Sequence, residues 1–166
     1  MPSLRSHGIR ATVPAGWDAR IYRRSDEVQA STPAAAALHQ GGTTHAVFHA
    51  ASFPLPEGRG DFGGGAVERM GPHDVLVALV EYHPDAAGTA LFRAHGIPRA
   101  LDPRAFSPTI LQRLLPGQAG TQVFFQERGR AWCLYVVLGS FAARAGLVSR
   151  VNEVLSALSV EPVGAS

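Results

Sequence analysis

The clearest alternation of apolar and polar residues predicts a β-hairpin near the C-terminal end of the chain. Residues 121–127 and 130–138 are rich in aromatic and β-branched side chains, and Arg128-Gly129 separates them. This separation is typical of a hairpin, although Arg-Gly is a weaker turn signal than Asn-Gly. The predicted register pairs Glu127 with Arg130, Phe125 with Trp132, and Val123 with Leu134. The opposite face carries a mixed set: Gln122, Phe124, Gln126, Cys133 and Tyr135.

A helical spacing of apolar residues follows this hairpin. Gly139 and Ser140 end the strand, and one continuous stripe is then formed by Leu147, Val148, Val151, Val154, Leu155 and Leu158. Polar residues occupy the other side of the helix, so we expect an amphipathic helix from about Leu147 that packs on the nearby sheet.

Alternation elsewhere predicts further strands. Residues 7–13 and 17–23 flank Pro14-Ala15-Gly16, which predicts an opening hairpin with one packed and one solvated face. Residues 44–53 predict a third strand. Residues 74–82 are apolar on both faces, as are residues 130–138, and this composition is typical of central strands covered on both sides.

The connecting segments are less regular. Residues 24–43 predict a loop with a helical turn at 34–38, and residues 54–65 predict a loop rich in Gly and Pro. A short helix is expected at 66–70. Within the long excursion from 84 to 120, Ser107-Pro108 and the later Pro116 predict a short helix over 107–115.

These elements together predict an α+β fold: a mostly antiparallel twisted sheet with the C-terminal amphipathic helix packed on one face. The length of 166 residues suits one domain. We assign residues 1–160 to this domain and residues 161–166 to a short flexible tail.

The composition excludes several chemistries. All fifteen basic residues are arginine, so no lysine is present to bind a phosphate in a P-loop, form a Schiff base or activate a serine. The formal net charge is only +2 and the arginines are scattered, which argues against nucleic-acid binding. No apolar run has the length of a membrane span, and a single cysteine suits a reducing compartment, so we expect a cytoplasmic protein without membrane contact.

The opening turn Pro14-x-Gly16-Trp17, together with a late strand that leads into one amphipathic helix, resembles the PsbP-like α/β sandwich superfamily. That superfamily includes an extrinsic photosystem subunit, a Ran-binding nuclear import factor and chaperones of secreted bacterial effectors. The resemblance covers about a third of the chain, at its two ends. It implies an antiparallel sheet with helices on its faces and a binding function, usually toward another protein, without a shared catalytic site. The excursion from 84 to 120 departs from this pattern.

The best-placed pair of titratable residues is Glu81 and His83, which share a face at the end of a central strand. Their side chains suit an acid–base couple or two metal ligands, and a strand end that emerges into solvent is the simpler interpretation. His45 and His49 share a strand face but lie about 13 Å apart at strand rise, too far for one ion. No metal motif is present, and we expect no metal and no cofactor.

Two further features favour structural roles. Cys133 lies in a strand packed on both faces and is expected to be a buried thiol. The glycine-rich loop, residues 58–65, is long enough to wrap a phosphate, but it lacks a following GK[ST] and is expected to be flexible.

The sequence therefore favours a non-catalytic module that binds another protein or a second copy of itself. We expect the contact surface in the excursion, through Leu91, Phe92, Phe106, Ile110 and Leu114. The alternative is a small enzyme or a metal- or ligand-binding protein that uses Glu81 and His83. A third possibility is a small apolar ligand held between the sheet and the excursion.

Overall fold

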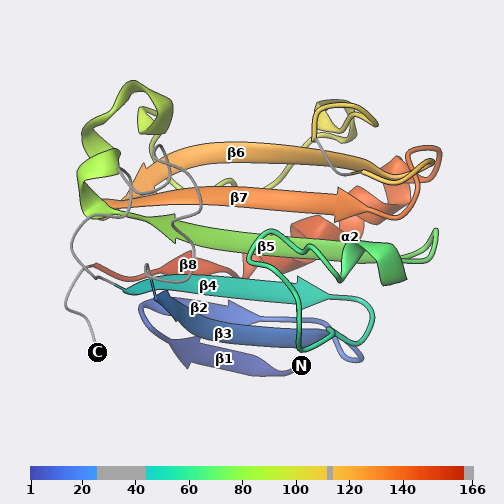
Figure 1. Ribbon diagram of the computed structural model, residues 1–166, viewed down its shortest axis with the longest axis horizontal. Coiled ribbons are helices and arrows are strands. Elements are labelled where there is room, and N and C mark those ends of the chain that lie inside the picture. Colours follow the sequence, from blue (N-terminus) through green and yellow to red (C-terminus); the bar gives the residue numbers. More distant parts are fainter. Residues whose placement is uncertain (26–43, 112–113, 163–166) are drawn as a thin grey trace.

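The computed structural model describes residues 1–25, 44–111 and 114–162, and this part of the chain forms two antiparallel sheets and one α-helix (Figure 1). The predicted α+β class is confirmed. The larger sheet has the order β3-β4-β5-β7-β6, with bounds Asp18–Ser25, Thr44–Ala51, Val75–Tyr82, Arg130–Leu138 and Ala119–Glu127. The smaller sheet has the order β1-β2-β8, with bounds Ser3–Ser6, Ile9–Thr12 and Ser159–Val160.

The predicted C-terminal hairpin is confirmed in both position and register. Strands β6 and β7 pair Glu127 with Arg130, Phe125 with Trp132, and Val123 with Leu134. Arg128 and Gly129 form the turn, with φ angles of 55° and 77°. Positive φ at both central residues is what a type I′ turn requires, and this turn matches the twist of the two strands it joins.

The positive φ at Arg128 leads to the first testable prediction. Asparagine adopts this left-handed conformation more readily than arginine does, and the Arg128 side chain is exposed. We expect Arg128→Asn to stabilise the protein by about 0.5 kcal/mol, because the turn is then less strained. Thermal unfolding followed by circular dichroism checks this, and a lower melting temperature for the variant would contradict it.

The two strands predicted to be central, β5 and β7, lie side by side in the middle of the larger sheet (Figure 1). Val75, Val77 and Leu79 of β5 face the main hydrophobic cluster, and we call this side of the sheet the core face. The alternate residues Leu76, Ala78, Val80 and Tyr82 point to the other side, which we call the loop face. Smaller clusters that include Leu76 and Tyr82 cover the loop face.

The helix α2, Arg144–Ser156, begins slightly before the predicted start at Leu147. Its buried side chains are five of the six in the predicted stripe: Leu147, Val148, Val151, Val154 and Leu155. The sixth, Leu158, is buried but lies beyond the end of the helix. They belong to the same cluster as Val75, Val77 and Leu79 of β5 and as Ile9 and Ala11 of β2. The main core is therefore shared by the helix, the smaller sheet and the core face.

The predicted opening hairpin is wrong. Strand β2 pairs with β1 on one side and with β8 on the other, while β3 pairs with β4. Both edges of β2 are thus occupied, and the Pro14–Trp17 turn moves the chain from one sheet to the other. The missed hairpin is β1–β2, whose turn residues His7 and Gly8 have φ angles of 50° and 78°.

The excursion after β5 contains short 3-10 helices rather than α-helix in its described residues. These are η3 Pro84–Gly88, η4 Ala90–Phe92 and η5 Pro103–Ala105. The helix predicted over 107–115 is wrong for the described residues 107–111, because the Ser107 backbone exchanges two hydrogen bonds with Gly120 at the edge of β6. The Ser107 hydroxyl still accepts the N–H of Thr109 at 3.1 Å, but residues 108–111 form bends and no helix follows.

Two remaining predictions concern local structure. The short helix expected at 66–70 is present as the 3-10 turn η2, Val67–Arg69. The helical turn expected at 34–38 lies outside the described residues. Glu161, where the tail was expected to begin, is held in place, since its N–H donates to the Gly8 carbonyl at 2.7 Å.

Candidate functional site

The structure separates Glu81 and His83, which the sequence suggested as a pair. The Glu81 carboxylate forms a two-point ion pair with Arg130, with distances of 2.6 Å from Nε to Oε2 and 3.0 Å from Nη2 to Oε1. His83 instead caps η3, because its Nδ1 accepts the N–H of Asp85 at 3.2 Å. The two side chains therefore have different partners, and both oxygens of Glu81 are already engaged.

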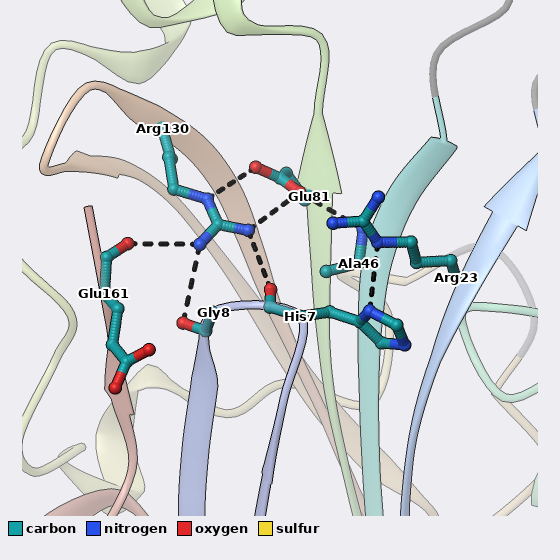
Figure 2. A network of polar contacts seen from close by, with 7 residues as sticks. All are labelled: His7, Gly8, Arg23, Ala46, Glu81, Arg130 and Glu161. Atoms are coloured by element: carbon teal, nitrogen blue, oxygen red, sulfur yellow. Dashed lines mark hydrogen bonds and ion pairs between the residues drawn. The ribbon is translucent and has the colours of Figure 1, made fainter. Parts of the chain in front are cut away.

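Arg130 is the centre of a buried polar network that joins distant parts of the chain (Figure 2). Besides Glu81, its guanidinium donates to the backbone carbonyls of His7 at 3.1 Å and Glu161 at 3.1 Å. It also lies 4.6 Å from the centre of the Trp132 ring, a cation–π distance. These contacts fasten β7 and β5 to the β1–β2 turn and to the end of β8, so we assign this network to stability.

The histidines do not assemble a metal site in the part of the chain that the structure describes. No group of three His, Cys, Asp or Glu side chains is close enough there to hold an ion. His49 is fully buried on the loop face, opposite Ala78 of β5.

His49 fastens the glycine-rich loop to β4. Its Nε2 lies 2.6 Å from the backbone carbonyl of Asp61, and its Nδ1 accepts Nε–H of Arg59 at 2.7 Å. The arginine must donate, so Nδ1 is unprotonated and Nε2 carries the proton that is donated to Asp61. Burial, reinforced by the nearby Arg59 charge, lowers the pKa of His49 to about 4.

The side chain of Asp61 adds two further contacts between this loop and β3. Its carboxylate accepts the hydroxyl of Tyr22 at 2.6 Å and Nη1–H of Arg24 at 2.7 Å. Burial, followed by the bond to Asp61, raises the pKa of Tyr22 well above its usual range. The loop that the sequence predicted to be flexible is thus held from two neighbouring strands.

This arrangement leaves a cavity of about 610 Å³ over the loop face, which we call the sheet cavity. Its sheet side is formed by Tyr82 of β5, Gln122 of β6 and Tyr135 of β7. The side walls come from the glycine-rich loop with η2 and from the excursion: Gly60, Asp61, Phe62, Gly64, Val67 and Glu68 on one side, Ile110, Leu111 and Leu114 on the other. The volume falls in the usual range for small-molecule sites.

Apolar and polar groups both contribute to the lining of the sheet cavity. Phe62 and Tyr135 meet edge to face, with ring centres 5.5 Å apart. The Gln122 amide and the Tyr82 hydroxyl make no hydrogen bond within the described residues, although both line the cavity. Burial raises the pKa of Tyr82 to about 12, so its hydroxyl is neutral at physiological pH. Such a site suits an apolar molecule with a few hydrogen-bonding groups.

The five residues expected to form a protein-binding surface are divided among different environments. Phe92 packs with Ala86 and Ala131 in a small cluster, and Phe106 belongs to the main core. Leu91 is 58% exposed and Ile110 is 50% exposed, whereas Leu114 packs partly buried beside Leu111. Only Ile110 and Leu114 come together, and they do so at the wall of the sheet cavity. Phe92 and Phe106 are buried in hydrophobic clusters and are therefore not available at a surface.

Cys133 lies on the loop face as a free, fully buried thiol. Burial raises its pKa to about 12, so it is not a thiolate nucleophile at neutral pH.

The sequence predicts the position of some residues that line the sheet cavity but not of others. The predicted hairpin register already places Gln122 opposite Tyr135 on the mixed face, and the structure has this pair. Nothing local indicates that residues 60–64 return to the same face, because that placement depends on His49 and Tyr22 from other strands.

Comparison of the sequence with family models, curated proteins and solved structures finds no match. The resemblance to PsbP-like proteins therefore stays a prediction. Within the described residues, no helix has the length and apolar character needed to cross a membrane.

Proposed function

We propose that this protein is a non-catalytic binding module that holds a small, largely apolar ligand in the sheet cavity. The observation that carries the proposal is the cavity itself: about 610 Å³ between the loop face and the excursion, with Tyr82 and Gln122 unbonded in its wall. Polar groups without protein partners in the wall of a partly apolar pocket are suited to orient a ligand.

In this proposal the two faces of the larger sheet have different roles. The helix α2 covers the core face, as in a PsbP-like sandwich, and the loop face binds the ligand. The shared cluster of Leu147, Val151 and Leu155 with Val75 and Val77 supports this arrangement. The proposal also places the protein in the cytoplasm. The enzyme alternative has less support, because Arg130 occupies the carboxylate of Glu81.

Filling the sheet cavity should abolish binding without unfolding the protein. Gln122 is an exposed strand residue in the cavity wall, so Gln122→Trp places an indole inside the cavity at a position that tolerates aromatic residues. With 2-naphthalenemethanol as the uncharged probe, we expect calorimetric titration to show binding to the unmodified protein. The variant should bind about tenfold more weakly or worse.

The matched control is Arg20→Trp, which places the same side chain at an exposed position of β3 outside the cavity lining. This control should leave the probe affinity unchanged. Equal affinities for the Gln122 variant and the unmodified protein, or no binding of the probe to either, would contradict the proposed function.

A second candidate keeps the protein partner that the sequence favoured. Ile110 and Leu115 are 50% and 40% exposed, and both lie in the excursion segment beside the cavity. Exposed apolar side chains at one segment suit a contact with a second copy or another protein. Sedimentation equilibrium tests self-association: if it occurs there, Ile110→Glu should shift the protein toward the monomer.

A further inference from the structure

The charged groups of the sheet cavity are unbalanced in the part of the chain that the structure describes. Two carboxylates, Asp61 and Glu68, belong to the lining, and no basic side chain does. Asp61 is compensated by Arg24 at 2.7 Å and by the Tyr22 hydroxyl. Glu68 is exposed and has no hydrogen bond or ion pair among the described residues. Glu68 is therefore the one uncompensated charge of the described lining.

The aromatic residues of the cavity favour the same sign of ligand charge. Phe62, Tyr82 and Tyr135 all line it, and the face of an aromatic ring attracts a cation by about 0.5–2 kcal/mol. Because the Tyr82 hydroxyl is neutral, it can accept a hydrogen bond from an ammonium group without itself carrying charge. Gln122 offers an amide oxygen for the same purpose.

We infer that the ligand of the sheet cavity is a small organic amine: an apolar or aromatic body that carries one protonated nitrogen. This inference rests on the proposed function, and it adds the ligand's chemical class. The body of the ligand packs against Ile110, Leu111 and Leu114, and its ammonium group lies toward Glu68 and the aromatic rings. A carboxylate ligand would meet Glu68 without a compensating cation in the described lining.

One basic residue needs its own test. Arg113 lies between Leu111 and Leu114 in the sequence and outside the described residues. Its contribution to the charge preference for the ligand is measured with Arg113→Gln.

The experiment uses three probes of the same shape and different charge: 2-naphthylmethylamine, 2-naphthalenemethanol and 2-naphthoate. Calorimetric titration at pH 7 and low salt should give the amine an affinity about fivefold or more above that of the alcohol, and the naphthoate the weakest binding. Added salt should reduce the affinity for the amine and leave that for the alcohol unchanged.

Removing the charge of Glu68 isolates its role. Glu68→Gln should reduce the preference for the amine over the alcohol, measured as the ratio of the two affinities. Glu153→Gln, at an exposed glutamate on α2, is the matched control and should change neither value.

The outcomes separate this inference from the proposed function. Binding of the alcohol tests the cavity, and the difference between amine and alcohol tests the ligand class. Equal affinities for all three probes would overturn the inference and leave the proposed function standing. A preference for naphthoate would also overturn it, and loss of that preference in Arg113→Gln would assign the selectivity to Arg113. If no probe binds, both fail.

Discussion

Replacement of Arg130 by methionine should lower the free energy of unfolding by about 3–5 kcal/mol. The side chains of Arg130 and Glu81 are 7% and 13% exposed, so the variant leaves a buried carboxylate without its cation. It also removes the donors to the carbonyls of His7 and Glu161. Methionine keeps most of the volume of the arginine stem, so the loss reports mainly on charge and hydrogen bonding. Urea denaturation followed by tryptophan fluorescence measures it.

Two comparisons make this prediction specific. Combining Arg130→Met with Glu81→Gln removes the orphaned charge and should recover part of the stability, since the amide oxygen can still accept the N–H of Ala46. Arg5→Gln breaks only the exposed ion pair to Glu161 and should change stability by less than about 1 kcal/mol. A loss for Arg130→Met no larger than that for Arg5→Gln would show that the network contributes little.

The second large effect is a loss of stability in acid that depends on His49. In the folded protein its pKa is about 4, against 6.5 for an unperturbed histidine, because burial disfavours the charged ring. Between these two values the unfolded chain binds a proton at this site and the folded protein does not. The free energy of unfolding therefore falls as the pH decreases from 6.5 to 4, by about 3 kcal/mol in total from this group.

Variants at two histidines separate this contribution from that of other titrating groups. His49→Gln keeps one donor for the Asp61 carbonyl and one acceptor for Arg59 but does not titrate, so its stability should depend less on pH across this window. His73→Gln, which replaces an exposed histidine by the same residue, is the matched control. The measurement is urea denaturation at pH intervals from 7 to 4. Parallel curves for the unmodified protein and His49→Gln would contradict the assignment.

Elements that are specified by residues close together in the sequence could be predicted correctly. The β6–β7 hairpin was predictable with its register because an Arg128-Gly129 turn and alternating apolar residues are local signals. Strand β5 was predictable because a strand buried on both faces is apolar throughout. The stripe of α2 is likewise a local pattern.

Interactions between distant segments could not be predicted in the same way. The β2–β8 pairing joins residues 9–10 to 159–160, and no pattern at either end specifies the other. The alternation of residues 7–13 predicts one continuous strand, whereas the His7-Gly8 turn separates β1 from β2, which begins at Ile9. Glu81 was predicted to be a candidate acid or base at the end of a strand, and the partner that occupies it, Arg130, lies in a different strand. The sheet cavity depends on the same kind of long-range placement.

The position of β8 in the smaller sheet has a consequence for synthesis in the cell. The pairing of Ile9 with Val160 and the bond from Glu161 to Gly8 link segments near opposite ends of the chain. While the ribosome still holds residues 159–161, strand β2 has an unpaired edge that other chains can join. The pairing of β2 with β8 therefore forms only after residues 159–161 have left the ribosome, and contacts of such long sequence separation are typical of slow-folding domains.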